Sequence, residues 1–261
     1  MKKQLTYAVM SLALVSGASA QIQTNAFDAG SNYGGAGEPG WTNGANAGFG
    51  FGPWDIVLSG DGFKGNFIGD PSFAGIGGMS TESFGLYANP PGSSASVQMT
   101  RSLTTSLQVG ETFSFQFGMN SASGDSAVSR KRIELFTGNF NFFASIANFS
   151  SDNVVTFIDN NYEGTDVFGP GTNAMTWSFT YTDPTNIFVT ANDRDGVGTF
   201  TTNLTTTEGI SSFYLMAWDL QPGDAAQPYF NNFAVTVPEP STYALLLLGG
   251  TSLWALKRRK S

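Results

Sequence analysis

Alternation of large and small side chains along short segments is the feature that most constrains how this chain can fold. In residues 111–120, ETFSFQFGMN, three phenylalanines and a methionine alternate with Ser, Gln and Gly, and residues 174–182, AMTWSFTYT, repeat the pattern. Successive side chains of a β-strand point to opposite faces, so each segment presents one apolar face to a core. We therefore expect two packed sheets. The side chains expected between them are Phe113, Phe115, Phe117, Trp177 and Phe179.

Strand-like segments of this kind continue along most of the chain, separated by turns rich in Gly, Asn, Asp and Pro. The segments predicted as strands are 55–58, 83–88, 96–100, 111–120, 132–136, 141–147, 153–158, 174–182, 186–191, 198–204, 211–218 and 229–237. Between the two ends of the chain no segment keeps a helical period. The prediction is an all-β fold, a two-sheet antiparallel β-sandwich. The strand order resembles jelly-roll and lectin-like sandwiches, an overall pattern from which no binding residue is carried over.

The first twenty residues, MKKQLTYAVMSLALVSGASA, have the pattern of an export signal. Two lysines precede a short apolar stretch, and the segment ends in small residues at Ala18 and Ala20. A basic start, an apolar core and a small-x-small end are typical of a secretory signal peptide. We predict a signal helix at 1–20 that is removed by cleavage after Ala20.

The last residues combine a proline-rich break, an apolar run and a basic end. Residues 241–256 are apolar, and the sixteen of them would extend about 24 Å as a helix, against about 30 Å for a bilayer core. We predict a short transmembrane helix there. A basic cluster beside an apolar segment keeps that end in the cytoplasm. The basic tail is Lys257, Arg258, Arg259 and Lys260, and the break before the helix is Val237, Pro238, Glu239 and Pro240.

This arrangement, VPEP followed by an apolar run and an Arg-rich end, resembles the PEP-CTERM sorting signal of Gram-negative bacteria. The resemblance extends from Val237 to Ser261, and we assign the sorting signal itself to residues 238–261. The resemblance implies cleavage near Pro238–Pro240 by an exosortase, a membrane protease. It also implies export through the inner membrane, a transient membrane anchor and delivery to the cell surface or extracellular matrix, often beside exopolysaccharide. The same tail is also known as an ice-binding-protein C-terminal motif, a label that describes the tail and does not establish ice binding.

Between the two signals lies an acidic region, residues 21–237, which we predict to be one exported domain. It has six basic and nineteen acidic residues, a formal charge of −13. Nucleic acid is therefore not expected as a partner, because phosphate binding needs a basic face. A Gly-rich stretch at 25–53 has the composition of loops, but aromatic residues punctuate it, so we expect it to lie against the domain.

The chain contains no histidine and no cysteine. The absence of histidine excludes Ser-His-Asp hydrolysis and most zinc and copper sites. The absence of cysteine excludes thiol catalysis, iron–sulfur clusters and Cys-ligated zinc. These two absences argue against most enzyme classes.

One turn contains closely spaced oxygen ligands. Asn192, Asp193 and Asp195 precede Gly196, and such a cluster could hold Ca²⁺. The spacing differs from an EF-hand loop, and a polar turn between two strands explains the same residues. We predict a turn without a cofactor, with Ca²⁺ as the alternative.

Tryptophans are the candidates for stacking on sugar rings. Trp41 and Trp54 border the Gly-rich stretch, where exposure would allow glycan stacking, whereas Trp177 and Trp218 follow strand patterns and are expected in the core. The sequence thus favours an exported, surface-sorted protein of the extracellular matrix, structural or weakly glycan-binding, and not an enzyme. The alternative is a carboxylate-based polysaccharide hydrolase or lyase on a lectin-like sandwich, for which nineteen acids supply many possible carboxyl pairs.

Overall fold

The computed structural model describes residues 22–34, 40–89, 94–120, 129–149, 154–192, 194 and 198–238. One compact unit is Thr24–Val235, and a second comprises Met1–Gln23 with Thr236–Ser261. The predicted signal helix at 1–20, with its cleavage residues Ala18 and Ala20, lies outside the described residues. So do Glu239, Pro240, the predicted transmembrane segment at 241–256 and the basic tail. In the part of the chain that the structure does describe, no helix is long and apolar enough to cross a membrane.

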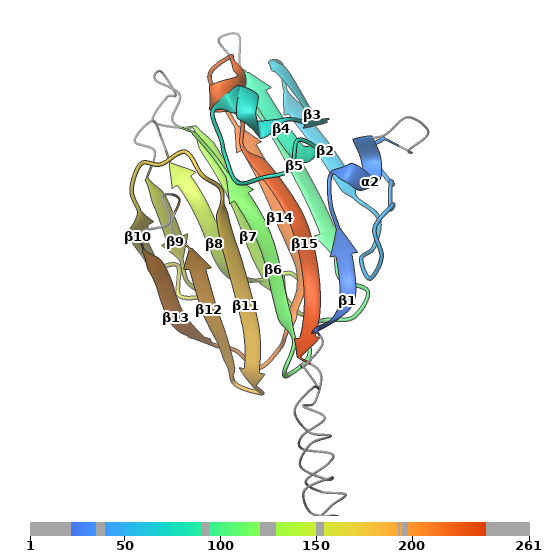
Figure 1. Ribbon diagram of the computed structural model, residues 1–261, viewed down its shortest axis with the longest axis vertical. Helices are drawn as coiled ribbons and strands as arrows, with labels where there is room; N and C mark the ends of the chain where they lie inside the picture. The colour runs from blue at the N-terminus through green and yellow to red at the C-terminus, as the bar shows by residue number, and fades with distance from the viewer. Residues whose placement is uncertain are drawn as a thin grey trace, which may run out of the picture. The chain divides into compact units, whose positions relative to one another are not determined.

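Two sheets face each other and form a β-sandwich (Figure 1). The larger sheet follows the order β13 (Thr199–Thr205), β12 (Asn186–Asn192), β11 (Met175–Asp183), β6 (Thr112–Gly118), β15 (Tyr229–Pro238), β4 (Ser83–Asn89) and β3 (Phe63–Gly69), and its eighth strand, β1 (Ile22–Asp28), also pairs with β15. The smaller sheet follows the order β10 (Gly164–Phe168), β9 (Val155–Ile158), β8 (Asn141–Phe149), β7 (Arg130–Thr137), β14 (Ile210–Trp218), β5 (Ala95–Ser102) and β2 (Asp55–Gly60).

The pairing within the sheets is antiparallel. All neighbours in the seven-stranded sheet are antiparallel. The pairs β3–β4, β4–β15, β6–β11, β11–β12 and β12–β13 of the eight-stranded sheet are antiparallel as well. The predicted all-β, two-sheet antiparallel sandwich is confirmed. Helical structure in the described residues is limited to the short elements α2 (Ser31–Gly34), η1 (Pro71–Ala74) and η2 (Asp224–Ala226).

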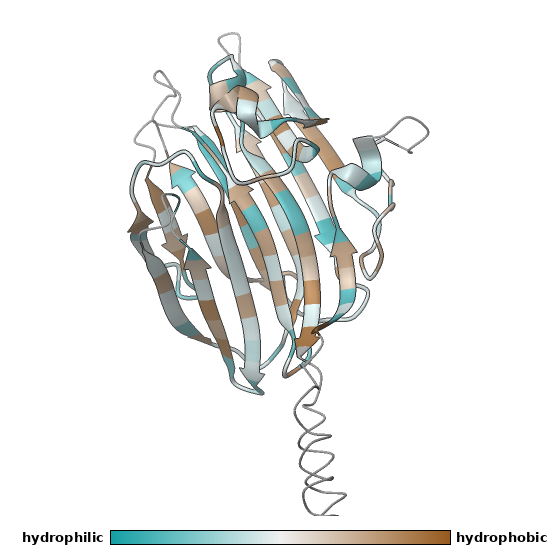
Figure 2. Cartoon of the chain, in the orientation of Figure 1, coloured by the Kyte–Doolittle hydropathy of each residue, from teal (hydrophilic) through white to brown (hydrophobic). Residues whose placement is uncertain are grey.

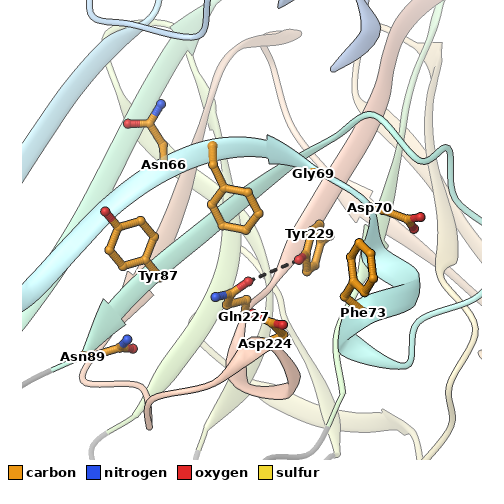
Figure 3. A pocket seen from close by; sticks show the side chains of 10 residues that line it. Asn66, Gly69, Asp70, Phe73, Tyr87, Asn89, Asp224, Gln227 and Tyr229 are labelled. Atoms are coloured by element: carbon orange, nitrogen blue, oxygen red, sulfur yellow. Dashed lines mark hydrogen bonds between the residues drawn. The ribbon is translucent and has the colours of Figure 1, made fainter. Parts of the chain in front are cut away.

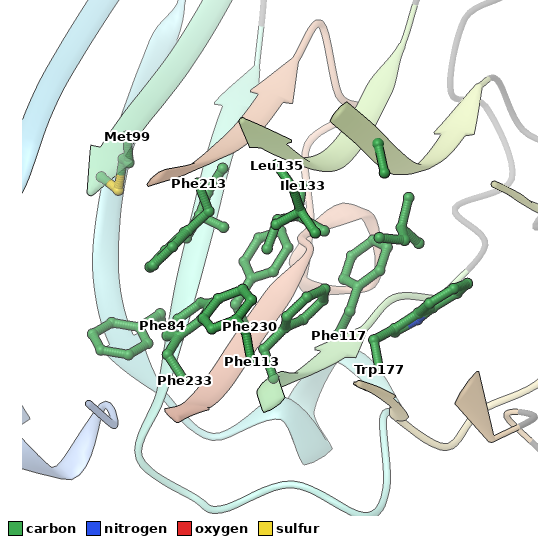
Figure 4. Close-up of a cluster of buried hydrophobic side chains, with 14 of the residues drawn as sticks. Phe84, Met99, Phe113, Phe117, Ile133, Leu135, Trp177, Phe213, Phe230 and Phe233 are labelled. Carbon is green, nitrogen blue, oxygen red and sulfur yellow. The ribbon is translucent and has the colours of Figure 1, made fainter. Parts of the chain in front are cut away.

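Alternation along the strands builds the core, and Figure 2 shows hydrophobic and hydrophilic bands following one another along them. All five side chains predicted inside the sandwich are at most 1% exposed. Rings from the two sheets meet there: Phe213 of β14 stacks on Phe233 of β15 at 4.5 Å and on Phe113 of β6 at 5.6 Å between ring centroids (Figure 4). Each fully buried phenylalanine contributes about 1.5–3 kcal/mol relative to an exposed one.

Near β1 and β5 the interior contains a buried ion pair. Asp28 of β1 and Arg101 of β5 form a salt bridge, and both side chains are fully buried. Arg101 also donates to the Gly52 carbonyl at 2.9 Å and to Asn46 Oδ1 at 2.5 Å. Burial lowers the pKa of Arg101 to about 9, which is still above neutral pH, so the guanidinium stays charged and requires its counter-ion. Since β1 and β5 belong to different sheets, this pair links the two layers.

A bulge in β15 decides which side chains of that strand face outward. Tyr229 and Phe230 pair with β4, and the following Asn232 has a left-handed backbone with φ of 52°. Phe230 and Phe233 both belong to the core although they are three residues apart, which requires one extra residue between them. The buried Asn231 accepts a hydrogen bond from the Gly30 amide at 2.9 Å and donates to Ser83 Oγ at 3.0 Å. Tyr229, which directly precedes the core residue Phe230, lies on the outer face of the sheet, beside β4.

Three strands were not predicted from the sequence: β1, β3 and β10. Their segments, IQTNAFD, FKGNFIG and GTDVF, contain too many polar residues or glycines to show a clear period of two. They form strands because each is hydrogen-bonded to a neighbouring strand whose own sequence pattern predicts a strand: β1 to β15, β3 to β4 and β10 to β9.

Candidate functional site

The outer face of the β3–β4 pair has aromatic side chains opposite glycines. Phe67 lies directly across from Gly85, and Tyr87 lies across from Gly65. A Cβ atom added to Gly65 would lie 2.6 Å from the Tyr87 hydroxyl oxygen, and one added to Gly85 would lie 2.6 Å from Phe67 Cε2. The two rings therefore occupy the space that the missing side chains leave, and they lie flat against the sheet.

These rings form the floor of an open pocket of about 530 Å³, hereafter the aromatic pocket (Figure 3). It is lined by Asn66, Phe67, Gly69, Asp70, Phe73, Tyr87, Asn89, Asp224, Gln227 and Tyr229. The lining comes from β3, β4, the start of β15 and the two short helices η1 and η2. Residues more than 130 positions apart in the chain meet because β15 pairs with β4.

The helix η1 holds one wall of the aromatic pocket. Asp70 caps its N-terminus by accepting a hydrogen bond from the Ser72 amide at 2.8 Å, and Gly75 ends it in a left-handed conformation with φ of 71°. This local geometry leaves Phe73 77% exposed at the mouth of the pocket. Phe73 therefore contributes little to the core, and its ring is accessible to a ligand.

Acceptor oxygens surround the aromatic floor. Burial, together with the nearby Asp224 and Asp70 carboxylates, raises the pKa of Tyr229 to about 12. The phenol is therefore protonated at neutral pH, and it donates a hydrogen bond to Gln227 Oε1 at 3.1 Å (Figure 3). Phe67 packs edge-on against the Tyr229 ring at 5.7 Å, which fixes both rings. Chemically, the pocket offers flat apolar ring faces beside amide and carboxylate groups.

The prediction that Trp41 and Trp54 are exposed stacking residues is wrong. Trp41 is 6% and Trp54 is 1% exposed. The indole of Trp54 donates to the Tyr33 hydroxyl at 3.2 Å, and the Trp41 ring packs on Phe84 at 4.6 Å. The described part of the Gly-rich stretch packs against the domain, as expected, and Trp41 and the adjacent Trp54 both belong to the core.

Two further tryptophans, Trp177 and Trp218, are expected in the core from the sequence, and one of them is buried there. Trp177 is fully buried, as predicted. Trp218 is 37% exposed, so its predicted burial is wrong. It is the last residue of β14 and alternates with the buried Ala217, which places the indole on the outer face.

The proposed calcium turn is described only in part. Asn192 is exposed at the end of β12, while Asp193 and Asp195 lie outside the described residues. Between them Arg194 is buried and donates to the Met119 carbonyl at 2.6 Å. Within the described ranges, no cluster of three or more acidic side chains could hold a metal ion.

The sequence signals that could have located the aromatic pocket are the paired segments 63–69 and 83–89. Both alternate glycine with aromatic residues, FKGNFIG and SFGLYAN, and glycine in a strand often marks close approach of another group. The contributions of Asp224, Gln227 and Tyr229 could not have been found in this way, because they depend on strand order.

Comparison with known proteins identifies the C-terminal segment. Residues 236–261 match the PEP-CTERM protein-sorting motif, as predicted, and Val237 and Pro238 at its start are the last residues of β15. This motif implies export and exosortase-mediated sorting to the cell surface. No curated protein matches the sequence.

Among solved structures, the Ca²⁺-bound exoplasmic/lumenal domain of VIP36 aligns over 81% of this chain and 89% of its own length, with 9% identity and a TM-score of 0.45. The botulinum neurotoxin serotype D ligand binding domain, solved in complex with N-acetylneuraminic acid, aligns over 71% of this chain and 45% of its own length. That match has 9% identity and a TM-score of 0.40. No residue role is carried over from either protein.

Proposed function

We propose that this protein is a non-enzymatic glycan binder that is displayed at the cell surface and associates with extracellular polysaccharide. The observation that supports the proposal is the aromatic pocket, in which rings lie flat against glycines and are surrounded by amide and carboxylate groups. Sites for small ligands combine a mainly apolar lining with a few placed polar groups, and a sugar ring has matching apolar faces and hydroxyl edges.

The polar groups of the pocket favour a neutral sugar. Asp70 and Asp224 both line it, and the region 21–237 has a formal charge of −13. An anionic sugar would be repelled there, whereas carboxylates and amides accept hydrogen bonds from hydroxyl groups readily. We therefore expect a neutral polysaccharide, such as a glucan or mannan, to bind with its ring faces on Phe67, Tyr87 and Phe73.

Affinity electrophoresis of the exported protein in gels that contain neutral polysaccharides tests this proposal. Phe73→Ala should weaken retention about tenfold, since stacking on a large ring is worth about 1–1.5 kcal/mol. The matched control is Phe140→Ala, which removes a 62% exposed ring from the turn between β7 and β8, away from the pocket. Equal retention of the two variants, or no retention of the unchanged protein by any neutral polysaccharide, contradicts the proposal.

The alternative function, a carboxylate-based hydrolase or lyase, is tested with the same material. Asp70 and Asp224 are the carboxyl groups in the pocket, and glycosidases act through two such groups. We expect bound polysaccharide to stay intact. Release of reducing ends or of unsaturated products that Asp224→Asn abolishes would show that the protein is an enzyme.

The sorting motif supports a second part of the proposal, that the tail is removed after export. Mass spectrometry of protein from the surface of a producing cell should find a C-terminus upstream of Tyr243. Changing Pro238 and Pro240 to Ala should leave an uncut chain in the membrane fraction. Surface protein that retains the segment 253–261 contradicts cleavage but leaves the glycan-binding proposal unaffected.

A further inference from the structure

A second open pocket lies on the seven-stranded sheet, with a volume of about 410 Å³. It is lined by Arg130 and Arg132 of β7, Met216 and Trp218 of β14, and Asp219, and we name it the tryptophan–arginine patch. Trp218 lies across from Arg130 and Met216 lies across from Arg132, so the four side chains are cross-strand neighbours on one face.

The indole of Trp218 is held in a fixed orientation. Its Nε1 donates to Asp219 Oδ2 at 2.7 Å, and Asp219 Oδ1 accepts from the Ala95 amide at 2.6 Å. Asp219 has a left-handed backbone with φ of 48°, which turns the chain at the end of β14. A ring that is both partly exposed and anchored loses little conformational entropy when a ligand packs on it.

The patch also gathers most of the accessible positive charge of the domain. Of the six basic residues in 21–237, Arg101, Lys131 and Arg194 are buried. Arg130, Arg132 and Lys64 are partly exposed, and two of these three lie in the patch. Anionic groups that approach this acidic protein are therefore favoured here over other parts of the described surface.

Several groups of the two arginines and of the nearby acids already have partners within the protein. Arg132 Nη1 pairs with Glu134 Oε1 at 2.9 Å, while Arg132 Nε is buried and has no acceptor among the described residues. Arg130 Nη1 donates to the Ser129 carbonyl at 2.8 Å, and its guanidinium lies 4.9 Å from the centroid of the Phe149 ring. Asp219 lines the pocket, and Glu134 follows Arg132 on the same face of β7; both carboxylates already accept from protein donors. A buried donor without an acceptor is costly unless a ligand or water supplies one.

We propose that the tryptophan–arginine patch binds a carboxylate-bearing sugar, a hexuronate residue of an acidic polysaccharide. The sugar ring packs on the Trp218 indole, and the carboxylate accepts hydrogen bonds from the guanidinium of Arg132, with Arg130 adding charge. Guanidinium groups suit carboxylates because both are planar and can form two parallel hydrogen bonds. This site lies on a different sheet from the aromatic pocket and has the opposite charge preference, so the inference does not depend on the proposed function.

Fluorescence quenching of the exported protein provides the test. Trp41, Trp54 and Trp177 are buried, so Trp218 is the tryptophan of the described chain that acrylamide reaches most easily. Oligogalacturonate should protect it from quenching, and the neutral oligogalactan of the same length should not. Trp218→Phe should remove the component that oligogalacturonate protects, which identifies the reporter.

Substitutions at the arginines sharpen the test. Arg132→Gln should weaken oligogalacturonate binding about tenfold or more, the value expected for losing a hydrogen bond to a charged group. Lys64→Gln is the matched control, since it removes one partly exposed charge outside the patch and should leave affinity unchanged. Added salt should weaken binding by screening.

Three results would overturn the proposal. The first is equal protection by the neutral oligosaccharide, which would mean that stacking alone operates. The second is equal loss in Arg132→Gln and Lys64→Gln, which would mean general charge attraction. The third is absence of protection, or protection by inorganic sulfate as strong as that by oligogalacturonate, which would mean that no sugar carboxylate is recognised.

Discussion

The two parts of the interior are built from different interactions. Between β6, β11 and β14 the core consists of aromatic and aliphatic side chains that alternate along each strand, as in Phe113, Phe115 and Phe213. Beside β1 and β5 the core contains a buried ion pair, Asp28 with Arg101, joined by Tyr33, whose hydroxyl donates to Asp28 Oδ2 at 3.1 Å and accepts from Arg101 Nη1 at 3.0 Å.

The stability of the first region therefore depends on the apolar side chains that alternate along each strand, whereas that of the second depends on pairing between residues far apart in the sequence. An apolar side chain in the central core contributes through the area that it removes from water, whatever its neighbours are. A buried charge is favourable only while its partner is present, because its desolvation cost is several kcal/mol. The first region should therefore respond to volume, and the second to pairing.

The largest effect is expected from Phe115→Ala in the central core. Removing a fully buried ring leaves a cavity, and we expect a loss of about 4 kcal/mol in the free energy of unfolding. Chemical denaturation monitored by circular dichroism measures it. Ser114→Ala, the neighbouring change on the outer face, should cost less than about 0.5 kcal/mol. Comparable losses in both variants would contradict the assignment of the two faces.

The next largest effect is expected where the ion pair is broken. Arg101→Met keeps most of the volume but leaves Asp28 charged and buried, which should cost about 3 kcal/mol. In the double variant Asp28→Leu, Arg101→Met, the charge is gone from both sides, and most of that loss should be recovered. Equal losses in the single and double variants would show that shape, not pairing, holds this region.

A smaller effect on stability is expected at the bulge in β15, between the core residues Phe230 and Phe233. Asn231→Ala leaves the Gly30 amide and Ser83 without their side-chain partner and should cost about 2 kcal/mol. Asn232→Gly is the control, because glycine adopts the left-handed backbone found there, and it should be neutral or slightly stabilising. A marked loss in the control together with none in Asn231→Ala would reverse our interpretation of the bulge.

The smallest effect is expected from a comparison of two buried tryptophans, Trp54 and Trp41, in the part of the core beside β1 and β5. Trp54→Phe removes the indole that donates to Tyr33, whereas Trp41→Phe removes a buried indole N–H with no acceptor among the described residues. The loss of ring area is similar, so Trp54→Phe should be less stable by about 1 kcal/mol, the value of one hydrogen bond. Thermal unfolding of the two variants measures the difference, and a greater loss in Trp41→Phe contradicts it.

The residues around the aromatic pocket illustrate how far the sequence could lead toward a site. Glycine and aromatic residues alternate in both 63–69 and 83–89, a pattern that is consistent with aromatic rings packed over glycines on one face of a sheet. That the two segments pair so that Phe67 meets Gly85 and Tyr87 meets Gly65 depends on register, and register depends on the turn and on neighbouring strands. The walls from η1 and η2 depend on contacts between distant parts of the chain.

What the sequence determined by itself is the strands with a strong period of two and the inward direction of residues such as Phe115 and Trp177, because that pattern is local to each strand. The sorting motif at 236–261 is likewise a contiguous signal. What the tertiary structure decided is which aromatic residues outside this pattern are covered: Trp41 and Trp54 are enclosed by the fold of the Gly-rich stretch around Arg101, and Trp218 is left exposed at the end of its strand. Burial at such positions depends on which distant segments pack against them, and no local period encodes that choice.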